Sequence, residues 1–160
     1  MSFRIGFGYD AHSLIEGRPL MLGGEQVPFE RGLNGHSDAD VLLHAIMDAL
    51  LGAAAMGDIG RCFPDSDPRY KDIESLLLLS QVWDKLMASH FNIANIDATI
   101  VAQLPKLTPY MPKMAGNIAR CLRLPDTAVN VKATTEEGMG FTGTGQGMAA
   151  YAICMVIIDN

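Results

Sequence analysis

The side chains best suited to chemistry are one carboxylate and two imidazoles in two separate segments: Asp10 with His12, and His44. Apolar residues alternate through positions 3–9, which predicts a β-strand that projects Asp10 and His12 to the same side. One carboxylate and two imidazoles are a common ligand set for zinc with an open fourth position, and an open position indicates catalysis. These residues therefore predict a catalytic Zn²⁺ site.

Each of these residues also has a purely structural interpretation. Asp10 and His12 could form a polar strand end, with a capping carboxylate and a surface histidine. His44 could be a hydrogen-bonded core histidine, because it lies among the apolar residues of a predicted helix. Asp48 follows His44 by one helical turn, so its carboxylate could accept a hydrogen bond from the imidazole and orient it for the metal, or it could be solvated.

A second candidate site is the glycine-rich segment 134–147. Its glycines fit neither a P-loop nor a dinucleotide-binding turn. Thr134 and Thr135 could offer hydroxyls to a phosphate, and Glu137 could offer a carboxylate to Mg²⁺, which prefers oxygen ligands. An ordinary surface loop is the alternative.

Composition limits the partners. With 160 residues, 49% of them hydrophobic, the chain predicts a single domain, residues 1–160. A formal charge of −6 without a cluster of basic residues argues against nucleic acid and against an anionic membrane surface. A small phosphate-bearing ligand stays possible if metal ions, helix N-termini or backbone N–H groups supply positive charge.

The three cysteines, Cys62, Cys121 and Cys154, are far apart and odd in number, which favours reduced thiols over a disulfide framework. The chain starts without an apolar signal segment and contains no apolar run of membrane-spanning length. We therefore expect a cytoplasmic protein.

The elements that position these residues predict an α+β fold with a mixed sheet. Predicted strands cover residues 3–10, 93–103, 129–133 and 148–158. A hairpin is expected from residues 20–22 and 27–29 around a loop at 23–26, with Pro28 indicating an edge strand. Predicted helices run from Ser37 or Asp38 to about Gly57, from 74 to 89, and onward from Pro109 or Pro112.

Several motifs then resemble one family. They are Gly6–His12, Gly35–Asp40, His44–Ala54, Gly57–Gly60, Phe63–Asp65, Ala102–Lys106 and Val131–Thr135. In this order and spacing the chain resembles the 2-C-methyl-D-erythritol 2,4-cyclodiphosphate synthase family nearly from end to end. For the fold we expect a four-stranded-type mixed sheet with helices on one face plus the β-hairpin, a ferredoxin-like variant assembled as a homotrimer.

The resemblance implies a phosphorus–oxygen lyase of the non-mevalonate isoprenoid pathway. Such an enzyme converts 4-diphosphocytidyl-2-C-methyl-D-erythritol 2-phosphate into the cyclic diphosphate and CMP, at active sites between subunits. It implies Zn²⁺ on Asp10, His12 and His44, a second metal (Mg²⁺ or Mn²⁺) at Glu137, and transition-state stabilisation by His36 and Thr135.

The implied substrate contacts fall into three groups. The 2-phosphate would meet His36 and Ser37. The erythritol would meet Asp58, Gly60, Phe63 and Asp65, with Phe141 also assigned to substrate binding. The cytidine and its phosphates would meet Ala102, Lys106, Leu107, Ala133, Thr134 and Thr135, although Lys106 could also be a plain solvated lysine.

The chain departs from the family's usual pattern at Thr144 and Gln146, where arginine and glutamate are common, and at Leu76, where arginine is common. The missing arginine makes binding of isoprenoid diphosphates in the trimer's central channel doubtful. Two other functions stay open: a phosphoesterase that uses a zinc-bound hydroxide, and a trimeric nucleotide-binding module.

Overall fold

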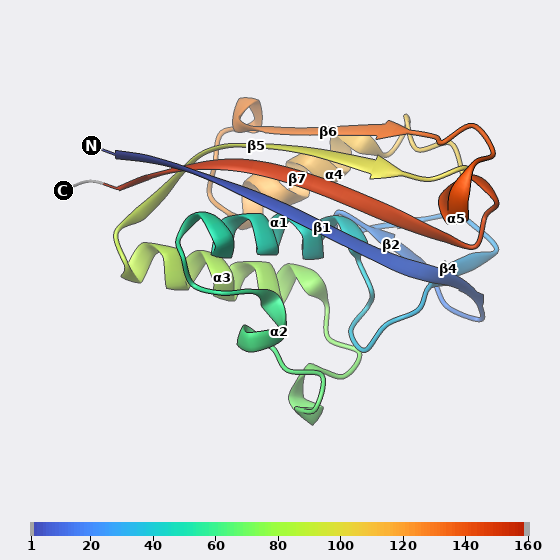
Figure 1. Cartoon of the computed structure of the whole chain (residues 1–160), viewed down its shortest axis with the longest axis horizontal. Helices are drawn as coiled ribbons and strands as arrows, with labels where there is room; N and C mark the ends of the chain where they lie inside the picture. Colours follow the sequence, from blue (N-terminus) through green and yellow to red (C-terminus); the bar gives the residue numbers. More distant parts are fainter. Residues whose placement is uncertain (1, 159–160) are drawn as a thin grey trace.

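A computed structural model describes residues 2–158 and shows one mixed sheet at the centre of the molecule (Figure 1). Its strand order is β4-β1-β7-β5-β6. The strands are β1 (Ser2–Glu16), β4 (Arg31–Leu33), β5 (Phe91–Val101), β6 (Val129–Thr134) and β7 (Gly147–Ile158). Among these described strands, β5 and β6 are the one parallel pair. The expected mixed α+β domain is confirmed, and the short β4 adds a fifth strand to the four that were expected.

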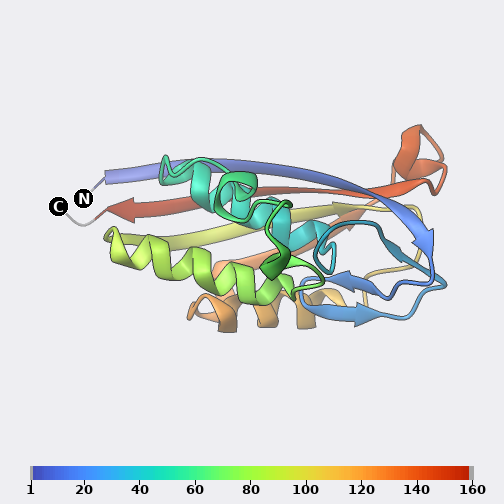
Figure 2. The same cartoon turned by 90° about the horizontal axis from the view of Figure 1, so that it is seen from below.

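The longer helices cover one face of this sheet (Figures 1 and 2). They are α1 (Val41–Ala53), α3 (Ser75–Ala88) and α4 (Met111–Cys121). The short helices are α2 (Ile59–Cys62), α5 (Gly140–Gly143), η1 (Pro68–Tyr70) and η2 (Asp126–Ala128). No helix within residues 2–158 is both long and apolar enough to cross a membrane.

The connection of the strands differs from the ferredoxin-like pattern, of which this fold was expected to be a variant. A ferredoxin-like domain has the order β-α-β-β-α-β. Here α4 lies between β5 and β6, and β6 leads through the short α5 into β7. Because β5 and β6 are adjacent and parallel, the chain needs a long crossover between them, and α4 supplies it.

The hairpin of β2 (Leu20–Leu22) and β3 (Glu25–Val27) turns more tightly than predicted. Gly23 and Gly24, with φ of 58° and 70°, make the turn alone, since both angles favour glycine. The carboxylate of Asp40 accepts hydrogen bonds from both glycine amides at 3.0 and 2.8 Å. It therefore ties the hairpin to the start of α1.

Helix α1 begins later and ends earlier than the predicted helix from Ser37 or Asp38 to about Gly57. Ala39 adopts a left-handed φ of 58°, which interrupts a helix, and Asp40 then caps α1 by accepting from the amide of Leu43 at 3.1 Å. At the other end Ala55 again has a φ of 58°. Helix α3 lies within the predicted 74–89, and Met111 starts α4 between the two predicted prolines.

Helix α1 packs very closely on β1 because Gly6 and Gly8 have no side chains. A Cβ atom at position 6 would lie 1.8 Å from the carbonyl oxygen of Ala49, and one at position 8 would lie 1.9 Å from that of Ala45. Small residues on both elements thus let their backbones touch. This contact fixes how far His44 on α1 lies from Asp10 on β1.

The opposite face of β1 and β7 is apolar and exposed. Its side chains are Phe3, Ile5, Phe7, Tyr9, Tyr151 and Ile153, of which Ile5 is 70% exposed. The longer helices α1, α3 and α4 lie on the other face (Figure 2). A contiguous apolar surface of this kind marks an interaction face.

Leu76 packs against the hairpin turn. A Cβ atom on Gly24 would lie 2.4 Å from Cδ1 of Leu76, so the side chain lies directly on the turn. A leucine in place of the family's usual arginine thus adds to the core. Its neighbour Leu77 is 54% exposed.

Candidate metal centre and active site

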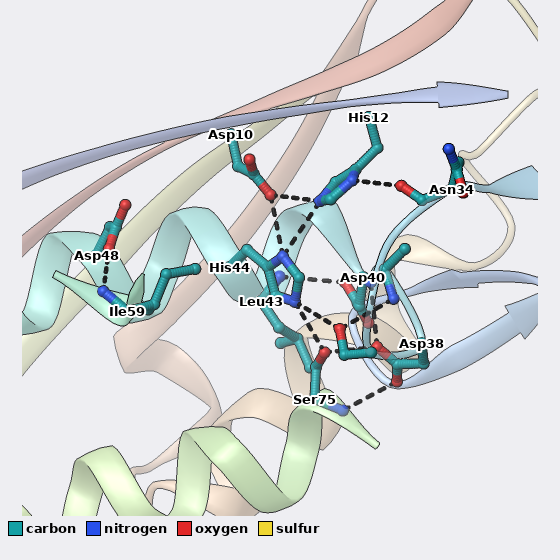
Figure 3. A network of polar contacts seen from close by, with 12 residues as sticks. Asp10, His12, Asn34, Asp38, Asp40, Leu43, His44, Asp48, Ile59 and Ser75 are labelled. Carbon is teal, nitrogen blue, oxygen red and sulfur yellow. Dashed lines mark hydrogen bonds and ion pairs between the residues drawn. The ribbon is translucent and has the colours of Figure 1, made fainter. Parts of the chain in front are cut away.

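Asp10, His12 and His44 converge on one point between β1 and α1 (Figure 3). The Oδ2 atom of Asp10 lies 2.7 Å from Nε2 of His12 and 3.0 Å from Nδ1 of His44. The two ring nitrogens are 3.2 Å apart. Tetrahedral zinc with bonds of about 2.0 Å needs ligand atoms about 3.3 Å apart. The three residues fit zinc with only a small expansion of this triangle.

Hydrogen bonds on the far sides of both rings orient them for a metal. Nδ1 of His12 lies 2.6 Å from the carbonyl oxygen of Asn34, which can only accept, so Nδ1 carries a proton and Nε2 is free to bind a cation. Nε2 of His44 lies 3.1 Å from the hydroxyls of both Ser37 and Ser75. Its Nδ1 is left facing Asp10.

Without a metal, Asp10 and His12 form an ion pair. Burial would raise the pKa of Asp10, but hydrogen bonds and the nearby charges of His12 and His44 outweigh burial and hold it well below its usual range. Burial would lower the pKa of His12, but the hydrogen bond and charge of Asp10 raise it above its usual value. A metal bound here must displace the His12 proton.

A cavity of about 260 Å³ opens beside these ligands. Its lining contains many of the residues expected from the sequence, namely Asp10, His12, His36, Ser37, His44, Gly60, Phe63 and Asp65. Nε2 of His36 is buried without a hydrogen-bond partner among the described residues, which suits a ligand that supplies one. The structure thus brings the three predicted zinc ligands and all of the predicted erythritol residues except Asp58 to the lining of one cavity.

Other lining residues were not predicted as site residues. They are Gly35, Met47, Ile59, Tyr70 and Leu78. Most are apolar and belong to, or border, helices, so their sequence pattern only indicates core packing. The ring of Tyr70 packs edge-on to Phe63 with centroids 5.3 Å apart, and this pair shapes the cavity wall.

The two other expected acidic residues have clear backbone partners. Asp58 caps α2 by accepting from the amide of Arg61 at 2.9 Å. Asp48, which could have oriented His44 or been solvated, instead accepts a hydrogen bond from the amide of Ile59 at 2.9 Å (Figure 3). Burial raises the pKa of Asp48. It therefore positions α2 beside the cavity.

The expected cytidine residues line a different cavity of about 220 Å³, at the ends of β5 and β6. They are Ala102, Lys106, Leu107, Ala133, Thr134 and Thr135. Asp10 pairs with Ala150, Ala150 with Ile100, and Ile100 with Ala133, so Asp10 and Ala133 lie three strands apart. Three strand spacings are about 14 Å. One chain thus holds two separate cavities.

Glu137 and Phe141 lie on the exposed segment that follows the second cavity and line neither cavity. Glu137 has a left-handed φ of 50°, and its amide donates to the hydroxyl of Thr135 at 3.2 Å. Thr144 caps α5 by donating its hydroxyl to the carbonyl oxygen of Gly140 at 2.8 Å. Among residues 2–158, the carboxylate of Glu137 makes no hydrogen bond or ion pair.

Comparison with known proteins identifies the family. The model of the YgbB family matches residues 3–157. This chain belongs to the YgbB family. A 2-C-methyl-D-erythritol 2,4-cyclodiphosphate synthase from Syntrophobacter fumaroxidans is 60% identical over 157 residues, which are 98% of this chain and 99% of that protein. The resemblance predicted from the motifs is confirmed.

Two solved structures share the fold. The bifunctional IspDF of Campylobacter jejuni superposes with a TM-score of 0.95 at 43% identity, and the match covers 99% of this chain but 43% of that longer protein. IspF of Plasmodium falciparum, solved as a CDP complex, gives a TM-score of 0.86 at 30% identity, covering 99% and 98% of the two chains.

Proposed function

We propose that this chain catalyses the cyclisation of 4-diphosphocytidyl-2-C-methyl-D-erythritol 2-phosphate to 2-C-methyl-D-erythritol 2,4-cyclodiphosphate and CMP. The observation that carries the proposal is the Asp10–His12–His44 triangle at the wall of a cavity, in a chain 60% identical to a protein named for this product. The reaction belongs to non-mevalonate isoprenoid biosynthesis, and the enzyme is a cytoplasmic phosphorus–oxygen lyase.

Zn²⁺ on Asp10, His12 and His44, with Mg²⁺ or Mn²⁺ at Glu137, would supply Lewis acidity to the phosphate oxygens as negative charge develops. The nucleophile is the substrate's own 2-phosphate. One of its oxygens bonds to the β-phosphorus while the bond from that phosphorus to the CMP oxygen breaks. The protein therefore needs no nucleophilic triad, and its task is positioning and electrostatic stabilisation.

The chain's own residues hold the reacting ends together. The cavity that contains His36 and Ser37 takes the 2-phosphate and erythritol, and the unpartnered Nε2 of His36 offers a contact to the transferring phosphoryl group. Thr135 lines the other cavity, where its hydroxyl stabilises the same group from the cytidine side. The relative from Plasmodium falciparum was solved as a CDP complex, which supports a cytidine-containing ligand.

We also propose a homotrimer whose active sites lie between subunits. The two cavities share no lining residue, and the carboxylate of Glu137 belongs to neither. The exposed apolar face of β1 and β7 supplies the surface that a neighbouring chain would cover. Closed cyclic symmetry then places the first cavity of each chain beside the second cavity of the next.

Product analysis tests the function. The protein is incubated with the diphosphocytidyl substrate, Zn²⁺ and Mg²⁺, and the products are identified by phosphorus NMR. CMP and the cyclic diphosphate in equal amounts are expected. His44→Ala should abolish turnover and zinc content, whereas Glu137→Gln should keep zinc and weaken the magnesium dependence. A linear hydrolysis product would favour the phosphoesterase, and binding without turnover would favour a nucleotide-binding module.

A further inference from the structure

The side of His44 that faces away from Asp10 is held by a buried chain of polar groups (Figure 3). Ser75 is the first residue of α3 and is fully buried. Its hydroxyl lies 3.1 Å from Nε2 of His44 and donates to Oδ1 of Asp38 at 2.5 Å. Its amide donates to the other oxygen of Asp38 at 2.9 Å. The carboxylate of Asp38 thus accepts hydrogen bonds from both the amide and the hydroxyl of Ser75.

The donors and acceptors in this series of hydrogen bonds can be assigned. An ionised carboxylate only accepts hydrogen bonds, so the Ser75 hydroxyl donates its one proton to the hydrogen bond with Asp38. Toward His44 that hydroxyl can then only accept, and Nε2 of His44 must be the donor. A proton on Nε2 leaves the lone pair on Nδ1, the atom that faces Asp10 and His12. The tautomer that binds a cation is the one that Ser75 and Asp38 select.

Ser37 does not select a tautomer in this way. Its hydroxyl also lies 3.1 Å from Nε2 of His44 and accepts from the amide of Ala39 at 3.2 Å. Within residues 2–158, the Ser37 hydroxyl makes no hydrogen bond to a carboxylate that would fix the direction of its proton. The hydroxyl of Ser37 can therefore donate to His44 as well as accept from it.

Asp38 is itself fixed by the two segments that meet at the start of α3. Its amide donates to the carbonyl oxygen of Ile73 at 3.1 Å, and the amide of Asp72 donates to that of His36 at 2.9 Å. The amide of Asp40 adds a further bond to Oδ1 of Asp38 at 3.1 Å. A carboxylate held this firmly can hold a hydroxyl in one orientation.

We propose that Ser75 and Asp38 are positioning residues for the zinc ligand His44: they fix its proton on Nε2 and its ring in the metal-binding orientation. Neither residue belongs to the ligand triangle or lines the cavity beside it. The inference rests on the zinc site of the proposed function. Ser75 is the first residue of α3, and a serine there would otherwise be explained by its place at the helix start alone.

Zinc affinity, measured by competition with a fluorescent chelator, tests this inference without relying on turnover. Ser75→Ala and Asp38→Asn should each bind zinc about 10–100-fold more weakly than the wild type, the usual effect of losing such a partner. Ser89→Ala is the matched control, because Ser89 is an exposed serine at the other end of the same helix and should bind zinc like the wild type.

Wild-type affinity in Ser75→Ala would overturn the inference while leaving the zinc site intact, whereas a wild type that binds no zinc would overturn the zinc site of the proposed function itself. Nitrogen NMR of the zinc-loaded wild type covers the case in which the variants do not fold. His44 should show a slowly exchanging proton on Nε2. A proton on Nδ1, with zinc on Nε2, would refute the selected tautomer.

Discussion

Replacing Gly8 with alanine should push α1 away from β1 and so damage both the fold and the metal centre. A Cβ atom at position 8 would lie 1.9 Å from the carbonyl oxygen of Ala45 and 2.8 Å from the amide nitrogen of Ala49. Both are backbone atoms of one helix, so no side-chain rotation relieves the overlap. The helix or the strand must move.

The size of the effect follows from this overlap. The contact to Ala45 must open from 1.9 Å to at least 3.0 Å, a displacement of about 1.1 Å. Overpacking a core typically costs about 1–3 kcal/mol, and a backbone overlap of this size belongs at the upper end, about 3 kcal/mol. Metal bonds tolerate errors of only about 0.2 Å, and the displacement separates His44 from Asp10, so zinc affinity should fall as well.

Urea denaturation of the metal-free protein and a zinc titration measure the two effects. Gly52→Ala is the control, since Gly52 lies in the same helix with no heavy atom within 4 Å of its added Cβ. Alanine there should stabilise the protein by roughly 0.5–1 kcal/mol. The reasoning is refuted if Gly8→Ala unfolds at the wild-type urea concentration and binds zinc with wild-type affinity.

Three further outcomes are expected. The His12–Asp10 ion pair stabilises the metal-free protein fully below the ordinary histidine pKa of about 6.5, and its contribution is lost as pH rises through the raised pKa of His12. Zinc affinity should rise over the same interval, because zinc displaces that proton; pH-independent zinc titrations would contradict this. Light scattering of the wild type should give three times the mass of one chain. Phe7→Asp should lower the measured mass, because it places a charge on the apolar face. An active wild-type monomer would contradict the trimer proposal. Geranyl diphosphate should bind weakly to the wild type and more tightly to Thr144→Arg, since charge-assisted hydrogen bonds contribute about 1.5–3 kcal/mol each; equally tight binding to both in calorimetry would exclude this control by residue 144.

The metal ligands could be predicted from strand alternation and residue type: Asp10 and His12 are close in sequence, and His44, although 34 residues from Asp10, supplies the second imidazole of a common zinc set. Strand alternation places Asp10 and His12 on one side, and the helix after Asp40 carries His44. The structure brings the three side chains together. The partner of His44 could not be predicted from spacing, since Ser75 lies 31 residues away and its position suggests only a helix start.

Other parts of the fold depend on contacts that a sequence pattern does not contain. The left-handed conformation of Ala39 delays α1, although Ser37 and Asp38 are both good capping residues. The strand order was missed for a similar reason. Alternation predicts each strand separately, but only long-range pairing decides that β7 lies between β1 and β5.

The three cysteines are free as expected, and burial raises the pKa of Cys154 to about 11.

The most direct test of the proposed cyclisation is a single reaction in oxygen-18 water. The protein, the diphosphocytidyl substrate, Zn²⁺ and Mg²⁺ are incubated, and CMP and the methylerythritol product are weighed by mass spectrometry. Attack by the substrate's own 2-phosphate consumes no water, so both products should be free of oxygen-18. Incorporation of one oxygen-18 atom into either product during turnover would show that water is the nucleophile and would contradict the account.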